Sequence, residues 1–489
     1  MFDKKTKQLG NVAVITFWGQ FASYTFNAIL IIFLTMPLVK SGLGLSEHDA
    51  YLLYGVIQAM GYILPVAGGY LADEVLGLRR SILFGSFLLA ISFLLLVTAT
   101  HLAKGHVHTA FLLTYPLIPI TNSLLMGTAS AMIGRIYMHD DQKAKRGMTV
   151  YYITINLGSM LGIAIAPMLI NSSYGPLGVF LLAFMGKFLA WLNFSLRRKL
   201  YDDVLFGKDT ERMTSRKWST LLAYIAVAYA VVVFLFDHPQ MSVFIIAAGI
   251  LFAIALFANK TMKLTGVIRQ KQLLSLYLLV IGFVFFVLYN QMNTSMILFT
   301  KNNSDLTLLG FKLYPSSFQL VNPIAIVVIG SFITKLYQRF PRFNIPYQFA
   351  TGIIIGGIGI SILYLAGLHA QNGLVSGNYV ATAYLVLTVA ELFVSAIGLS
   401  MISLYCDMKM MAFAMGVWFL TTSLSNLASG ELSELVALPK HHASAVHTLP
   451  IYTHYYFYLG LTSVVIGLVF MVISRWFNQR YQQRGIVLP

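Results

Sequence analysis

The sequence has few charged residues and almost no cysteine. Only 10% of its 489 residues are Asp, Glu, Lys or Arg, whereas a typical soluble domain has about 25%. The single cysteine, Cys406, excludes a disulfide framework. We also expect no cleavable signal peptide, because the first apolar segment is long and lacks a small-residue cleavage pattern. These absences exclude an ordinary soluble domain and a small disulfide-stabilised fold.

Apolar residues make up 58% of the chain and gather in segments of sufficient length to cross a membrane as helices. A membrane β-barrel would instead show alternating segments of about ten residues. The pattern predicts an all-α membrane protein with fourteen transmembrane helices. The expected spans are 11–38, 50–72, 81–100, 110–134, 149–170, 177–196, 218–236, 242–258, 272–299, 314–336, 347–368, 379–402, 411–431 and 452–476.

The net charge of +16 reflects an uneven distribution of Lys and Arg among the loops. With both termini in the cytoplasm, 27 of these residues lie in inside loops and five in outside loops, while Lys187 lies within a span. This bias follows the positive-inside rule and argues against nucleic acid as a partner. All eleven histidines fall in loops or at span ends, so we expect no metal site and no cofactor.

Six spans, an inserted pair and six further spans suggest two bundles related by pseudo-symmetry. The expected divisions are 1–200 for the first bundle, 201–270 for the insertion and 271–489 for the second bundle. This layout is typical of secondary transporters that alternate between two open states around a site near the middle of the membrane.

Glu391 is the only carboxylate that this assignment places deep inside the membrane. A buried ionisable group in hydrocarbon is costly and by default marks a functional path. The alternative is a structural hydrogen bond between helices.

The loop at 68–85 reads GGYLADEVLGLRRSILFG. Gly77 permits a tight turn between two spans, while Asp73, Arg79 and Arg80 can contact neighbouring helix ends. An ordinary basic inside loop is the simpler interpretation. The order of residues resembles the conformational-gate motif of the major facilitator superfamily.

The segment 151–162 reads YYITINLGSMLG. Tyr152 and Asn156 share one helix face, and Gly158, Ser159 and Gly162 permit close helix contact. Tyr and Asn could serve only as contacts between helices. The segment resembles the signature of the proton-dependent oligopeptide transporters, and the segments 61–65, 318–326, 390–401 and 415–430 add further similarity. The resemblance covers nearly the whole chain and is nearest to bacterial di- and tripeptide permeases.

This resemblance implies a major facilitator fold, a small peptide substrate, proton coupling and a position in the bacterial inner membrane. A peptide has a charged amino end that suits a carboxylate, and variable side chains that suit roomy aromatic walls. We expect a monomer in the lipid bilayer. The residues expected to bind substrate are Tyr24, Tyr62, Tyr152, Asn156, Asn290, Gln291, Asn322, Glu391, Ser395 and Trp418.

Four positions depart from the family pattern. The two acids and the arginine of its first span fall on Thr16, Gly19 and Gln20, and the lysine of its fourth span falls on Met126. Removing all four charges together avoids stranding any one of them. Lys187 is a candidate replacement cation, or a side chain that only extends toward the membrane surface.

The sequence therefore predicts a transporter of di- or tripeptides or peptide-like molecules, whose usual proton coupling is in doubt. One alternative is a facilitator or exporter of a non-peptide metabolite. Another is a ligand sensor that retains the fold without transport. We expect no enzyme activity, because there is no HExxH motif and no pair of acids within the spans.

Overall fold

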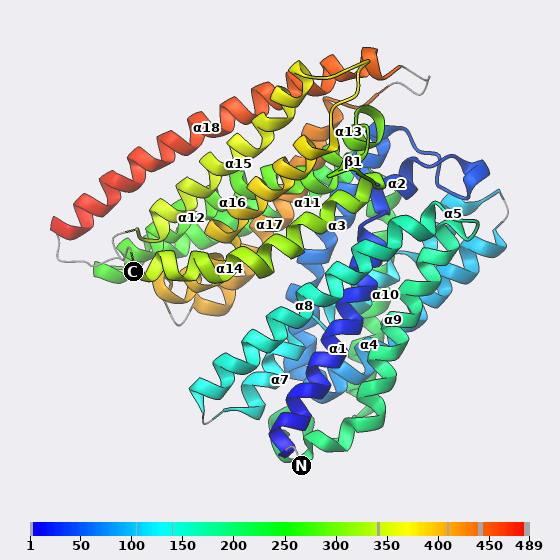
Figure 1. The fold of residues 1–489 in the computed structure, drawn as a ribbon. Coiled ribbons are helices and arrows are strands. Elements are labelled where there is room, and N and C mark those ends of the chain that lie inside the picture. The colour runs from blue at the N-terminus through cyan, green and yellow to red at the C-terminus, as the bar shows by residue number, and fades with distance from the viewer. Residues whose placement is uncertain are drawn as a thin grey trace. The chain divides into compact units, whose positions relative to one another are not determined.

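The computed structural model describes residues 3–103, 105–138, 140–339, 343–407, 410–438 and 444–483. This part of the chain is almost entirely helical (Figure 1). Its one short ladder pairs β1 (Thr307–Leu308) with β2 (Phe311–Lys312) in antiparallel register. The prediction of an all-α protein is therefore confirmed.

The chain forms two compact units. The first comprises Met1–Leu45 and Met60–Pro239, and the second comprises Ser46–Ala59 and Gln240–Pro489. Helix α3 (Glu47–Leu71) thus begins in the second unit and continues into the first.

The first unit consists of helices joined by short turns. Its elements besides α3 are α1 (Lys4–Asn27), α2 (Leu30–Thr35), η1 (Leu38–Lys40), η2 (Ala72–Leu76), α4 (Leu78–Leu102), α5 (Val107–Thr114), α6 (Leu117–Ser123), α7 (Thr128–Ile136), α8 (Asp141–Ile170), α9 (Gly175–Arg197), η3 (Arg198–Val204), η4 (Gly207–Asp209) and α10 (Ser215–Asp237).

The fourth predicted span is interrupted, although the sequence pattern suggested one continuous helix over 110–134. The structure divides it into α5, α6 and α7. Pro116 lies at the first break, where its ring removes a backbone donor. Gly127 lies at the second, with φ +82°, a conformation that glycine adopts without strain. Pro116 and Gly127 thus interrupt the helix, although the surrounding residues are as apolar as those of a continuous span.

Two glycines of α8 let this helix approach α1 closely. A Cβ atom on Gly158 would lie 2.5 Å from the Phe17 carbonyl oxygen, and one on Gly162 would lie 2.5 Å from that of Phe21. Such small residues are the usual means of close helix packing in membranes. The expected role of Gly158 and Gly162 is confirmed.

The second unit also consists of helices, beginning after α11 with α12 (Gly266–Tyr289). Its other elements are α11 (Pro239–Met262), η5 (Asn290–Asn293), α13 (Ser295–Asn303), η6 (Pro315–Leu320), α14 (Val321–Arg339), α15 (Ile345–Leu368), α16 (Gly377–Tyr405), α17 (Met411–Glu434) and α18 (Ala445–Gln483). Helices α15 and α18 run side by side (Figure 1). A Cβ atom on Gly357 would lie 2.8 Å from the Gly460 carbonyl oxygen. Small residues therefore allow the short distance between these two helices as well.

The first half of α3 is held within the second unit by contacts to α13, to α17 and to the residues that follow α17. Glu47 accepts hydrogen bonds from the Leu438 N–H at 2.9 Å and from Asn302 Nδ2 at 3.3 Å. Farther along, a Cβ atom on Gly55 would lie 3.5 Å from the Cα of Gly430. Residues 46–59 are therefore grouped with the second unit.

The two helices of the insertion pack on different units. Helix α10 belongs to the first unit, where the Tyr229 hydroxyl donates to the Leu113 carbonyl at 2.8 Å. Helix α11 ends in the second unit, where Thr261 Oγ1 accepts from Gln272 Nε2 at 2.8 Å. The two inserted helices therefore belong to different units, α10 to the first and α11 to the second.

Twelve helical segments of the described residues are long and apolar enough to cross a membrane. Two predicted spans are not among these twelve. They correspond to α14 and α17, which are nevertheless helices of 19 and 24 residues. The coarse assignment as a polytopic helical membrane protein stands.

Candidate functional site

The intramembrane carboxylate of Glu391 is held by side chains from two other elements. On α16, its Oε2 accepts a hydrogen bond of 2.7 Å from Asn322 Nδ2 at the start of α14. Asn322 Nδ2 also lies 3.1 Å from Thr388 Oγ1, one turn before Glu391. The Tyr289 hydroxyl at the end of α12 is a further partner of the carboxyl group. The structure thus brings together two predicted site residues, Asn322 and Glu391.

This arrangement orients the carboxyl group without neutralising it. Neither Asn322 nor Tyr289 carries a positive charge, and a carboxylate has about four acceptor positions. Within the described residues, no Lys, Arg or His lies within ion-pairing distance of Glu391. Such a group can receive a cation, and the ammonium group of a small molecule would form charge-assisted hydrogen bonds with it.

Gln291 has no polar atom to spare for a ligand. Its side chain is fully buried. Its Nε2 donates to Ser429 Oγ at 2.9 Å, while its Oε1 accepts from Ser295 Oγ at 2.6 Å and from the Tyr455 hydroxyl at 2.8 Å. Its neighbour Asn290 differs, because its buried Nδ2 atom has no hydrogen-bond partner among the described residues. Of the two adjacent amides, Asn290 is the one with unused capacity.

Trp418 is packed inside the second unit. Only 5% of its surface is exposed, and its ring lies 5.8 Å from that of Phe286 in an edge-to-face arrangement. A Cβ atom added to Gly398 would overlap the indole ring. Ser395, also predicted to bind substrate, lies one turn after Glu391 and is partly buried. The structure therefore places Ser395 one turn from the Glu391 carboxylate. It places Trp418 in the buried contacts between helices of the second unit.

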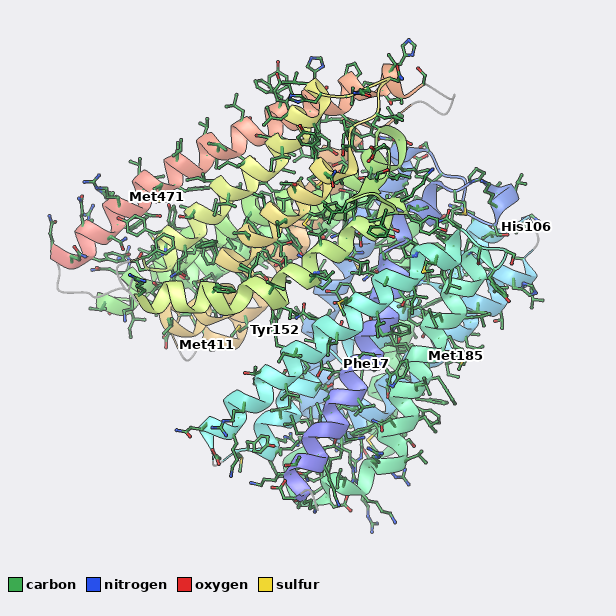
Figure 2. The ribbon with its side chains drawn as sticks, viewed as in Figure 1. Phe17, His106, Tyr152, Met185, Met411 and Met471 are labelled. Atoms are coloured by element: carbon green, nitrogen blue, oxygen red, sulfur yellow. The ribbon has the colours of Figure 1, made fainter. Side chains whose placement is uncertain are left out.

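In the first unit, the predicted tyrosines are partly accessible. Tyr24 is 38% exposed and Tyr152 48% exposed, and Figure 2 shows Tyr152 on α8. Tyr62 is partly buried on α3. Asn156 is buried, and its Nδ2 donates to the backbone carbonyl of Tyr152 at 2.9 Å. The predicted pair of Tyr152 and Asn156 is thus joined through the backbone of Tyr152.

The four departures from the family pattern also lie in the first unit. Thr16 is buried, and its Oγ1 has no hydrogen-bond partner in the part of the chain that the structure describes. Gly19 and Gln20 are partly buried on α1. Met126 lies in the interruption between α6 and α7. Lys187 of α9 is buried and donates to the Gly19 carbonyl and to Ser23 Oγ, each at 2.6 Å.

The predicted gate loop, residues 68–85, contacts the linker between α9 and α10, residues 198–214. The fully buried carboxylate of Asp209 accepts the Arg79 backbone N–H at 2.8 Å and forms an ion pair with Arg135. The Arg80 guanidinium donates to the carbonyls of Lys208, at 3.2 Å, and Glu211. This set of contacts fixes the loop at both of its arginines.

Two further groups strengthen the connection between the loop and the linker. Arg79 pairs with Asp202 at 2.5 Å, and Arg135 stacks over the Phe206 ring at 4.3 Å. Hydrogen bonds from Lys217 and Lys208 lower the pKa of Glu211, so the linker keeps this charge at neutral pH. Asp73 is exposed on η2, a π-helical turn. The linker acid Asp209, rather than Asp73, is the buried charge beside the gate loop.

Sequence reasoning did not single out Asp209 or Arg135. The available signal was the acid within GKDTER in a charged loop after the sixth span. That signal is weak, because charged loops contain many solvated acids.

Gly77 is expected to tolerate no side chain. Its φ of +79° favours glycine, and an added Cβ would lie 2.7 Å from both the backbone N and Oδ1 of Asp209. Gly77→Ala should lower the unfolding free energy by about 1–3 kcal/mol from backbone strain, with a further loss from the clash. Thermal unfolding of the purified protein measures the change.

Gly207→Ala is the matched control, because Gly207 also has positive φ, at +60°, but has no atom within 4 Å of an added Cβ. It should show the strain alone. Equal destabilisation by the two variants would contradict the predicted clash at Gly77.

The sequence matches the PTR2 domain, described as the POT family, over residues 79–449. It is 31% identical over 469 residues to dipeptide and tripeptide permease A of Chromobacterium violaceum, covering 95% of this chain and 92% of that protein. A permease of the same name from Salmonella typhimurium is 28% identical and covers 98% of this chain and 94% of its own length. The similarity thus extends through both units.

Solved structures show the same fold. A bacterial homologue of the human drug peptide transporters PepT1 and PepT2 aligns with a TM-score of 0.82 and 23% identity, covering 97% of this chain and 99% of that one. Tetrameric PepTSo2 aligns with a TM-score of 0.86 and 23% identity, covering 98% and 100%. At this identity the comparison establishes the fold alone.

Proposed function

Because the chain belongs to the POT family of multi-pass inner-membrane peptide transporters, we propose that it carries di- or tripeptides, or peptide-like small molecules, by alternating access. The protein is a transporter and not an enzyme. The observation that supports this substrate class best is the Glu391 carboxylate, which Asn322 orients at 2.7 Å and which has no neutralising cation among the described residues. The ammonium end of a peptide provides that cation.

The other proposed contacts differ in how well their geometry suits a ligand. In the second unit, Asn290 has an unused donor, and Ser395 lies one turn from Glu391. In the first unit, Tyr24, Tyr62 and Tyr152 remain proposed contacts for peptide side chains or backbone. We propose structural roles for Asn156, Gln291 and Trp418, since the first two use their amides internally and the third is packed.

We propose that transport depends weakly on the proton gradient. The sequence has Thr16, Gly19, Gln20 and Met126 where the family pattern has charged residues. A symporter that moves one proton per substrate gains about tenfold accumulation per pH unit, equivalent to about 1.4 kcal/mol. A carrier without proton coupling gains none.

Uptake of dialanine into proteoliposomes should therefore give an accumulation ratio near one, with or without an imposed pH gradient. Empty liposomes serve as the control. Strong accumulation driven by the gradient would contradict the proposal. Binding of dialanine without any flux would favour a sensor, and flux of other metabolites without dialanine binding would favour a non-peptide carrier.

We propose fourteen spans with both termini in the cytoplasm, arranged as 1–200, 201–270 and 271–489. Helices α14 and α17 support the two spans beyond the twelve, and the Lys and Arg bias supports the orientation. Labelling of single cysteines introduced into the terminal segments from each side of the membrane tests the topology. We propose a monomer, which a mass measurement in lipid nanodiscs tests.

A further inference from the structure

Lys187 is a buried cation whose nearest partners are uncharged. It projects from α9 and is only 5% exposed. Its Nζ donates to the Gly19 carbonyl and to Ser23 Oγ on α1, each at 2.6 Å. Within the described part of the chain, no carboxylate lies within ion-pairing distance of it.

A lysine in this position is expensive if its only role is to join α1 to α9. Burial of an ammonium group without an opposite charge is strongly unfavourable, and two neutral oxygens offset only part of that cost. A serine or glutamine could link the helices without carrying a charge. An ammonium group also has three N–H donors, of which Gly19 and Ser23 account for two. One donor remains for a ligand.

The surroundings of Lys187 offer both space and a second polar group. An added Cβ on Gly19 would have no atom within 4 Å, so there is open space where a side chain at position 19 would begin, and we call this space the gap at Gly19. One turn earlier, on the same side of α1, lies Thr16. Its buried Oγ1 has no hydrogen-bond partner. A hydroxyl and an ammonium group beside a gap are suited to bind a small anion.

We propose that Lys187, with Thr16 and the gap at Gly19, forms a binding site for one carboxylate group. If the proposed peptide transport is correct, this carboxylate is the C-terminal group of the substrate. The residue thus determines specificity for substrates that carry a free carboxyl end. The same chemistry could be supplied by a small carboxylate from solution, which the experiment separates from the peptide.

The first test compares dialanine with its C-terminal amide in binding to the purified full-length protein, and uses acetate as a separate probe. The parent protein should bind the free acid about tenfold more tightly than the amide, equivalent to about 1.4 kcal/mol for a charged hydrogen bond. Lys187→Met should reduce that ratio to near one and leave amide binding unchanged. Acetate should stabilise the parent and not the variant. Lys199→Met, at an exposed lysine of the same unit, is the control.

A second variant keeps Lys187 and adds a competing carboxylate. Gly19→Glu places an acid in the gap, where it should pair with Lys187 and abolish the preference for the free acid. Gly10→Glu is matched to it, because Gly10 lies on the same helix, is exposed, and also has no atom within 4 Å of an added Cβ. Gly10→Glu should retain the preference. This pair decides the question if Lys187→Met fails to fold.

An unchanged ratio of acid to amide binding in both Lys187→Met and Gly19→Glu would overturn the proposal. If acetate stabilises the parent but dialanine does not bind, Lys187 belongs to a site for a small carboxylate from solution. That result would support the carboxylate site and refute the proposed peptide transport. Absence of both peptide binding and acetate stabilisation would refute the site and the function together.

Discussion

Asp209→Ala is expected to destabilise the protein by about 3–5 kcal/mol, because it leaves a largely buried arginine without its partner. The Asp209 side chain is 0% exposed and that of Arg135 is 22% exposed. The substitution also removes the acceptor of the Arg79 backbone N–H, which lies 2.8 Å from Oδ1. Thermal unfolding of the purified full-length protein measures the loss. Transport should fall with it, because the gate loop loses its one contact to a fully buried linker carboxylate, although Arg79 and Arg80 keep their contacts to Asp202, Lys208 and Glu211.

Asp202→Ala provides the control. Asp202 pairs with Arg79 from the same linker, but its side chain is 58% exposed, so its removal should cost no more than about 1 kcal/mol. Asp209→Asn should fall between the two, since an amide oxygen can still accept the Arg79 N–H. If Asp202→Ala and Asp209→Ala destabilise the protein equally, the linker acts through exposed charges and not through the buried pair.

Glu391→Gln should weaken the binding of dialanine about tenfold or more, because a hydrogen bond to a charged group contributes about 1.5–3 kcal/mol. The amide retains the shape of the side chain and an oxygen for Asn322, but it cannot attract an ammonium group. We expect little change in stability, since the 2.7 Å contact from Asn322 Nδ2 is preserved. Calorimetric binding of dialanine to the parent and the variant measures the effect.

N-acetyl-dialanine distinguishes the proposed role from a general disturbance of the site. It lacks the ammonium group, so the parent should bind it weakly and Glu391→Gln should not weaken it further. Glu431→Gln, at an exposed acid of α17, should leave dialanine binding unchanged. A similar loss of affinity for both peptides in Glu391→Gln would show that Glu391 serves only the contacts between helices.

Much of the fold was accessible from apolar segment length and loop charge. Helices cross hydrocarbon because the backbone must satisfy its own hydrogen bonds there, so segment length translates directly into spans. The close approach of α8 to α1 was also predictable, because Gly158 and Gly162 recur on one face. The interruption at Gly127 was not, because a single glycine in an apolar run is compatible with both helix and break.

The candidate site was only partly predictable. Glu391 was identified from the cost of burying a carboxylate, and Asn322 was identified from the family resemblance. The structure shows that the two side chains form a hydrogen bond of 2.7 Å. Gln291 shows the opposite outcome, since its three close side-chain partners come from α13, α17 and α18. No local pattern could show that these hydroxyls would converge on one amide.

The sequence by itself determined that this is a helical membrane transporter of the POT family, and that one carboxylate lies within its second half. Those conclusions depend on composition, segment length and short motifs, which are local properties. Only the tertiary structure decided the partners. Arg79 meets Asp209 across 130 positions and Lys187 meets Gly19 across 168. Such partnerships depend on how the helices pack, and packing places side chains from distant segments within hydrogen-bonding distance without leaving a periodic signal in either segment.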